Sequence, residues 1–486
     1  MDVDFPGIAR DLLNARPNAG RMLLIVALTV GVLVRFYRLS AVPMTADEGA
    51  AWAAAIEPVH RLLVLQPVMD PGKLALYDLL LHYWIRIFGD GLASLRSLSA
   101  TLDTISIFLI FAVLREAHQA FDEEGSETAE HAGGFAALLF ATNAVLVESA
   151  RNARMYPLAL AAELAQILYF IRAQHHNGVV NCILAAVFLA LAVAANFTAI
   201  FLVAAETVWL AYLLITRWRS RSGVQLRIVG PGLALAAGLS LLVLFAAASL
   251  VTSRGALNSR AVDWIRYRSP LRWSYDVLHN SAANKSLFKL LVALAAFGTW
   301  RYWRRTSWVP IFLLVLVVTP FALVAILSLF GRPLMVDRYV LLAQVAFLGL
   351  AALGAAAFNS RFGRLLVLVL IIWLSARALR RWSGFWVDWR TAVAIDSAKL
   401  SHDATIDVVP SYAANVVRYY LPPDRRALAH GLGAGCGDSR VLIISPGHLT
   451  APSYMSELNA CYPRLLGRAT RVEVRSNDDI GKGPRR

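Results

Sequence analysis

The sequence has little charge and few cysteines, and each shortage excludes classes of protein. Asp, Glu, Lys and Arg make up 16% of its 486 residues, whereas a soluble protein carries about a quarter. The three cysteines, Cys182, Cys436 and Cys461, lack the spacing of a metal site. We find no other metal motif, no internal repeat and no low-complexity segment. The sequence therefore predicts neither a soluble globular domain nor a zinc module nor a repeat protein, and nothing in it calls for a metal or a cofactor.

Apolar residues are abundant, and they form long blocks. They make up 58% of the chain, the mean hydropathy is +0.56, and short basic loops separate the blocks, as in membrane proteins. A span in lipid must satisfy its own backbone, so the spans are helices. We predict a mainly α, polytopic membrane protein with about eleven transmembrane helices. The predicted spans are 22–39, 97–115, 133–148, 157–172, 179–195, 197–215, 228–251, 286–300, 308–330, 339–358 and 364–380.

Segment 74–88 is apolar enough to span the membrane, but its polar residues favour a surface position. Asp78, His82 and Arg86 are spaced four apart, so they form one stripe on a helix. Such a stripe is typical of a helix that lies in the membrane interface. With this placement, the N-terminus and the basic clusters after 215 and after 300 share one side, which is the cytoplasm by the positive-inside rule.

The net charge of +15 would indicate nucleic-acid binding in a soluble protein. Here most arginines lie in the loops between apolar blocks, where they orient the chain and touch lipid headgroups. We therefore expect membrane lipids as partners and no nucleic acid.

The tail has no predicted span. It alternates helix-like stretches with strand-like runs at 405–409, 441–445 and 471–474, which predicts a small α/β domain on the outer face. The chain thus divides into a transmembrane domain, 1–382, and an outer domain, 383–486. Outside the cytoplasm Cys436 and Cys461 can oxidise, but the sequence does not show whether their Cβ atoms meet.

Acidic and basic side chains gather in the predicted outer loops. These candidates are Asp47, Glu48, Asp70 and Lys73 in loop 40–96, Arg151, Arg154 and Tyr156 in loop 149–156, and Arg332, Asp337, Arg338 and Tyr339 near loop 331–338. The mixture suits transfer of a sugar from a lipid phosphate. Cations would hold the phosphate and stabilise it as the leaving group, and a carboxylate would take the proton of an acceptor hydroxyl. The structural alternative is that the acids cap a helix and the bases anchor at headgroups.

Several of these segments together resemble a known family, the GT-C fold membrane glycosyltransferases of glycosyltransferase family 39, which include protein O-mannosyltransferases and ArnT-like enzymes. The segments that carry the resemblance are TADEGAAW (45–52), GKLALYDLLLHYWIRIFGD (72–90), SARNARMYPL (149–158), RPLMVDRYVLLA (332–343) and VDWRTAV (387–393). The resemblance covers most of the chain, and it rests on the combination rather than on one motif.

The resemblance implies an inverting glycosyltransferase that takes a sugar from a polyprenyl phosphate on the periplasmic face of the bacterial inner membrane. It places Asp47 as general base, Glu48 as its substrate-orienting partner, and Lys73, Arg154 and Arg338 near the donor phosphate. The substrate-pocket candidates are Asp70, Tyr77, His82, Tyr156 and Tyr339.

The sequence departs from the family pattern at four positions: Leu74 and Ala75 replace paired prolines, Asp78 replaces a tyrosine and Asp337 a proline. These changes leave the sugar open, and the acceptor is equally open among protein, lipid and glycan.

A transporter or flippase of a lipid-linked sugar is the main alternative. Such proteins carry ionisable residues at mid-membrane. Glu163 and Glu206 lie inside predicted spans, and the other span interiors are nearly free of charge. This composition favours the enzyme.

Overall fold

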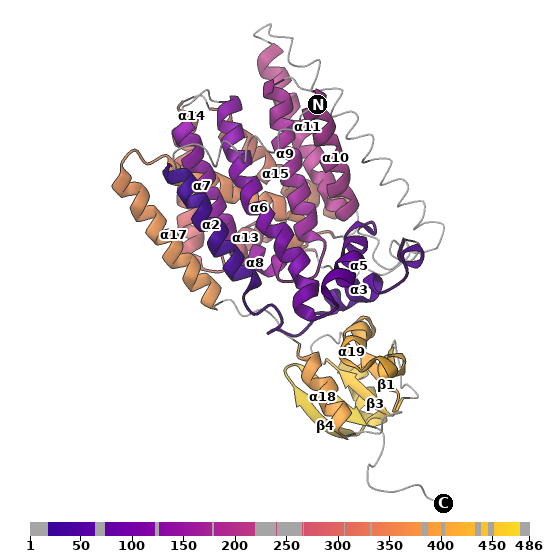
Figure 1. Cartoon of the computed structure of the whole chain (residues 1–486). Helices are drawn as coiled ribbons and strands as arrows, with labels where there is room; N and C mark the ends of the chain where they lie inside the picture. The colour runs from indigo at the N-terminus through magenta and orange to yellow at the C-terminus, as the bar shows by residue number, and fades with distance from the viewer. Residues whose placement is uncertain are drawn as a thin grey trace, which may run out of the picture.

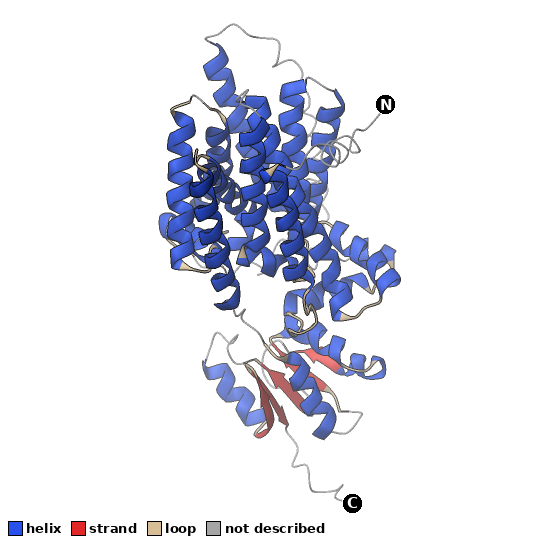
Figure 2. Ribbon diagram, turned by 60° about the vertical axis from the view of Figure 1, so that its left-hand side comes forward, coloured by secondary structure: helices blue, strands red, loops and turns tan. Residues whose placement is uncertain are grey.

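The protein is a helical bundle with a small α/β domain at one end (Figures 1 and 2). The structure is a computed structural model. It describes residues 18–63, 73–121, 126–176, 179–218, 240, 265, 267–305, 307–330, 333–381, 387–399, 404–432, 439–445 and 452–476.

Helices occupy the predicted spans, apart from 228–251, of which the structure describes residue 240 alone. In the described part of the chain, 6 helices are long and apolar enough to cross a membrane, or 7 if the bent pair α7/α8 counts as one span. The remaining predicted spans are helices that do not meet this test of length and composition. The bundle contains α2 (Ala19–Phe36), α6 (Leu92–Phe121), α7 (Ser126–Thr142), α8 (Ala144–Ala150), α9 (Tyr156–His176), α10 (Val179–Ala195), η1 (Phe197–Ala199), α11 (Ile200–Trp218), α13 (Pro270–Ser281), α14 (Lys285–Trp303), α15 (Val309–Phe330), η3 (Asp337–Val340), α16 (Leu341–Ala356) and α17 (Arg361–Arg381).

Buried ion pairs fix the first helix against its neighbours. Arg35 on α2 donates from Nε to Asp103 on α6 at 2.6 Å and from Nη1 to the Ala141 carbonyl of α7 at 2.9 Å. Both members of the Arg35–Asp103 pair are fully buried. A buried ion pair contributes little net stability to the folded protein. Removing one partner is nevertheless strongly destabilising, because the other charge stays buried without a partner. The pair therefore specifies how α2, α6 and α7 meet.

Glycine permits a close contact between α14 and α16. Gly298 on α14 faces Gly354 on α16, and a Cβ at either position would overlap the backbone of the opposite helix. Small residues let helices pack tightly where lipid supplies no hydrophobic driving force.

Two short helices, α3 (Ala46–Ala55) and α5 (Leu76–Phe88), lie at the end of the bundle that faces the α/β domain (Figure 1). Helix α5 has 13 residues, about 20 Å at 1.5 Å per residue, and is too short to span. The predicted polar stripe does not face headgroups along its whole length, because Asp78 and His82 are buried against the protein. The exposed face is apolar instead, with Leu80, Tyr83 and Ile87.

The α/β domain contains one mixed sheet in the order β2-β1-β3-β5-β4. Strands β1, β2 and β3 are parallel, and β5 pairs antiparallel with both β3 and β4. The sequence predicted β1, β3 and β5 correctly and missed β2 and β4. The elements are α18 (Trp389–Lys399), β1 (Ile406–Val409), η4 (Ser411–Ala413), α19 (Ala414–Tyr420), η5 (Pro423–Leu428), β2 (Ala429–Gly431), β3 (Val441–Ile444), α20 (Pro452–Cys461), β4 (Arg464–Ala469) and β5 (Val472–Ser476).

Cysteine chemistry agrees in part with the expectation for an oxidising compartment. Cys461 takes part in a disulfide bond, whereas Cys182 does not. The expected partner, Cys436, lies outside the described residues.

The α/β domain docks on α3. Trp52 of α3 packs edge-on against Tyr419 at 5.2 Å between ring centroids, and the Arg426 guanidinium lies 5.1 Å from the Trp52 ring. Gly49 faces Val416 so closely that a Cβ would come within 2.6 Å of Val416 Cγ2. Burial raises the pKa of Tyr419 to about 12. The domain therefore holds the helix that carries the predicted catalytic acids.

Candidate active site

Helix α3 begins with a capping box, and this motif separates the roles of the two acids. Thr45 is the N-cap, its hydroxyl accepts from the Glu48 amide, and the Glu48 carboxylate accepts from the Thr45 amide at 2.8 Å. The capping alternative is therefore correct for Glu48. Asp47 has a different environment. Its carboxylate is 50% exposed and accepts from Arg338 Nη1 at 3.2 Å.

Glu48 is fully buried, and both its oxygens are taken by the protein itself. Arg96 of α6 donates to Oε1 from Nε at 2.7 Å and to Oε2 from Nη2 at 2.8 Å. The Ala153 amide donates to Oε1 at 2.9 Å. The Glu48 carboxylate therefore contacts α6 and loop 151–155, and it does not face open space as a side chain that orients substrate would.

Two predicted phosphate ligands meet beside Asp47. Arg154 donates from Nη1 to the main-chain oxygen of Asp47 at 3.2 Å, and Arg338 pairs with the Asp47 carboxylate. Arg338 also lies over the Tyr156 ring, 5.7 Å from its centroid. Loops that are far apart in the sequence thus converge on one end of the bundle.

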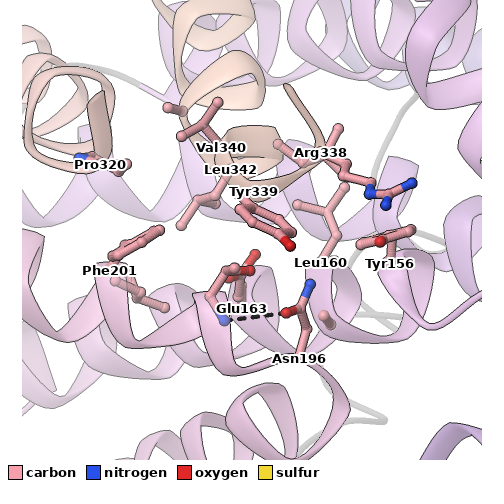
Figure 3. Close-up of a pocket in the computed structure, with 15 residues that line it drawn as sticks. Tyr156, Leu160, Glu163, Asn196, Phe201, Pro320, Arg338, Tyr339, Val340 and Leu342 are labelled. Atoms are coloured by element: carbon pink, nitrogen blue, oxygen red, sulfur yellow. Dashed lines mark hydrogen bonds between the residues drawn. The ribbon is translucent and has the colours of Figure 1, made fainter. Parts of the chain in front are cut away.

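A narrow pocket runs from Arg338 into the bundle (Figure 3). Tyr156, Tyr339 and Arg338 line it, and so do Glu163 of α9 and Asn196, which precedes η1. Its volume of about 20 Å³ is enough for one water molecule. Two of the predicted pocket residues, Tyr156 and Tyr339, are therefore brought together with the Arg338 site.

Lys73 has an acidic partner inside the protein. Its side chain is 2% exposed, and its ammonium contacts Asp78 Oδ1 at 3.0 Å and Oδ2 at 2.9 Å. Asp78 is the residue that replaces the family's tyrosine, and it neutralises the lysine inside the protein. The structure thus provides a partner for Lys73 other than a phosphate.

The other pocket candidates hold the surrounding helices together. Tyr77 is fully buried and shares a hydrogen bond of 2.8 Å with Ser99, and burial raises its pKa above the ordinary value. His82 Nδ1 lies 2.7 Å from the Ala55 carbonyl at the end of α3. Neither lines the pocket beneath Arg338. Asp70 lies outside the described residues.

Sequence reasoning missed the partner of Glu48. Arg96 lies at the start of a long apolar helix, where a cation reads as an interface anchor, yet it is 2% exposed. Its Nη1 donates to the Leu39 carbonyl at 2.6 Å and the Val42 carbonyl at 2.8 Å. No spacing rule links Glu48 to Arg96, so only the tertiary structure identifies the pair.

Among the described residues, no group of three or more His, Cys, Asp or Glu side chains is placed to hold a metal ion. The assembled site contains a half-exposed carboxylate, two guanidiniums and two tyrosines. Such a set can accept a proton and bind an anion.

Comparison with known proteins identifies the fold. No protein-family model matches the sequence, and no curated protein matches it significantly. The structure of ArnT from Cupriavidus metallidurans in the apo state is similar, with a TM-score of 0.59 and 12% identity over 96% of this chain and 98% of that one. The archaeal oligosaccharyltransferase AglB from Archaeoglobus fulgidus is also similar, with a TM-score of 0.52 and 11% identity over 88% of this chain and 69% of that one.

These neighbours are GT-C fold glycosyltransferases. The chain therefore has the GT-C fold, a polytopic helical membrane architecture, with a small C-terminal sheet.

Proposed function

We propose that the protein is an inverting glycosyltransferase that moves a sugar from a polyprenyl-phosphate donor to an acceptor hydroxyl. The observation that carries the proposal is the half-exposed Asp47 carboxylate beside Arg338, on a fold that glycosyltransferases share. The AglB structure contains a dolichol-phosphate, which supports a polyprenyl-phosphate donor here. We place the reaction on the periplasmic face of a bacterial inner membrane, where the α/β domain would lie.

The proposed reaction is a single displacement. Asp47 takes the proton from the acceptor hydroxyl, and the acceptor oxygen forms a bond to the anomeric carbon. The bond between that carbon and the phosphate oxygen breaks, and the electron pair leaves with the phosphate. Arg338 and Arg154 stabilise the charge that develops on the leaving group. One attack from the opposite face inverts the anomeric centre.

The Asp47–Arg338 pair can open for this chemistry at little cost. The two side chains are 50% and 37% exposed, and exposed ion pairs contribute about 0–1 kcal/mol. A donor phosphate can therefore take over Arg338 and leave the Asp47 carboxylate facing the acceptor. Asp47 is also the second residue of α3, where the helix dipole stabilises a carboxylate.

Glu48 and Arg96 are proposed as positioning residues. Their ion pair fixes the start of α3 against α6 and the loop before α9. Lys73, Tyr77 and His82 support the same end of the bundle from α5 and the segment before it.

The test uses purified protein and a sugar-charged polyprenyl phosphate. Release of free polyprenyl phosphate that depends on an acceptor supports the enzyme. Movement of the intact lipid across a proteoliposome bilayer without cleavage supports the alternative, a transporter or flippase. The buried Glu163 and Glu206 are the observation that keeps this alternative in view, because transporters use such residues. The acceptor class, whether protein, lipid or glycan, is identified by comparing the glycosylated products of a deletion strain with those of its parent.

A further inference from the structure

A second cavity lies apart from the pocket beneath Arg338. Its volume is about 340 Å³, within the range of small-molecule sites, about 300–1,000 Å³. It opens between the outer ends of α2, α8 and α17, which lie at the end of the bundle that faces the α/β domain (Figure 1). Its lining residues are Val34, Val42, Arg96, Val147, Glu148, Arg151, Asn152 and Leu379.

The cavity adjoins the surface that meets lipid. Helices α2 and α17, which contribute Val34 and Leu379, both present apolar side chains outward, such as Leu33 at 63% and Trp373 at 52% exposure. In a membrane protein these faces contact acyl chains. A ligand with an apolar tail can therefore extend from the cavity along them.

The polar wall of the cavity offers one charge of each sign. Arg96 is already neutralised by Glu48. Arg151 donates to the Val34 carbonyl at 3.1 Å and the Arg38 carbonyl at 3.3 Å, which are neutral groups. Among the described residues no carboxylate pairs with it. Burial and the neighbouring Arg96 lower the pKa of Arg151, so a nearby anion would be favourable.

Glu148 supplies the opposite charge. In the part of the chain that the structure describes, its carboxylate has no hydrogen-bond or ion-pair partner. Glu148 is half-buried, and a partly desolvated carboxylate without a partner is stabilised when a cation joins it. A plain anion would satisfy Arg151 and repel Glu148, and a plain cation would do the reverse. A ligand that carries both charges satisfies the two residues together.

We propose that this cavity binds a zwitterionic aminophospholipid of the phosphatidylethanolamine class, with its ammonium at Glu148, its phosphate at Arg151 and an acyl chain along α2 or α17. The site is separate from the proposed chemistry, because the Asp47 carboxylate is not among its lining residues. It nevertheless shares Arg96 with the ion pair that positions α3. Bound lipid would therefore stabilise the ion pair that holds α3 in the proposed active site.

The experiment is native mass spectrometry of the full-length protein released from nanodiscs that contain equal amounts of dioleoyl phosphatidylethanolamine, phosphatidylcholine and phosphatidylglycerol. We expect preferential retention of phosphatidylethanolamine. Phosphatidylcholine should bind less well because its methyl groups block hydrogen bonds to Glu148, and phosphatidylglycerol lacks the ammonium. Glu148→Gln should weaken phosphatidylethanolamine retention about tenfold, the loss of one charge-assisted hydrogen bond.

Glu206→Gln is the matched control, because Glu206 is a buried membrane carboxylate that does not line this cavity. It should retain the lipid as the unchanged protein does. If Glu148→Gln fails to insert, Leu379→Trp provides the second test by filling the apolar end and should also reduce retention. Equal retention of the three lipids, or retention unaffected by Glu148→Gln, would show only annular lipid and overturn the site. Because no donor sugar is present, this result is independent of the glycosyltransferase proposal.

Discussion

The buried Glu48–Arg96 pair offers a quantitative test of the site's architecture. Glu48→Gln keeps the size of the side chain but replaces one oxygen with an amide NH2. Each Glu48 oxygen accepts two hydrogen bonds, one from Arg96 and one from a main-chain amide. Whichever way the new amide turns, its NH2 group faces two donors. The substitution also leaves the buried Arg96 without a counter-charge.

The expected cost is large, because breaking a buried, hydrogen-bonded ion pair costs about 3–5 kcal/mol. The measurement is the free energy of unfolding in mixed micelles, titrated with a denaturing detergent. Glu57→Gln is the matched control, since the Glu57–Arg61 pair spans 3.8 Å at 40% and 64% exposure. This control should change stability by less than about 1 kcal/mol.

Turnover should fall together with stability in Glu48→Gln, because α3 loses its anchor to α6. The apparent affinity for the donor should change little, since Glu48 does not face open space. If Glu48→Gln and Glu57→Gln gave the same unfolding free energy, the pair would not anchor α3. A loss of donor affinity at normal stability would restore Glu48 to direct substrate contact.

Three further predictions concern the phosphate ligands, the Lys73 pair and the topology. Arg154→Lys and Arg338→Lys should weaken donor use about tenfold or more, because lysine lacks the guanidinium fork. Arg377→Lys is the control, because Arg377 lies over the Trp373 ring of its own helix α17, 4.9 Å from the centroid. Equal donor dependence in all three variants would mean that Arg154 and Arg338 are interface anchors. Lys73→Ala should lower the free energy of unfolding by about 3–5 kcal/mol. The double variant Lys73→Met with Asp78→Leu should recover most of this lost stability. If Lys73→Ala were stable but no longer used the donor, Lys73 would be a phosphate ligand as the sequence predicted. Reporter fusions at Ser222 and Ser476 should report opposite compartments, and the same compartment for both would refute the proposed orientation.

Hydrophobic patterning predicted most of the bundle because lipid imposes helices on apolar blocks. The strands at 405–409, 441–445 and 471–474 were equally predictable, since the first two are mainly apolar runs and the third alternates apolar and charged residues. The sequence did not predict strands β2 and β4, because Ala429–Gly431 and Arg464–Ala469 carry mixed side chains with little apolar pattern. Their strand conformation comes from pairing with neighbours.

The candidate site was predictable only in part. Loop position and the family resemblance brought Asp47, Arg154 and Arg338 to one side, and the structure places them within contact distance. The same reasoning weighed helix capping and headgroup anchoring as alternatives for these residues. It had no means to detect that Lys73 and Glu48 are already paired, because Asp78 and Arg96 become their partners only through packing.

The most direct test of the central claim is the rate at which purified Asp47→Asn releases polyprenyl phosphate from a sugar-charged donor. Asparagine preserves size, and Thr45 and Glu48 form the capping box without Asp47. The substitution therefore costs only the stabilisation of a charge near the helix N-terminus, about 0.3–1 kcal/mol. The variant should therefore fold and bind the donor normally. If Asp47 is the general base, turnover should fall by about 10²–10⁴. Turnover close to that of the unchanged protein would remove Asp47 from the mechanism.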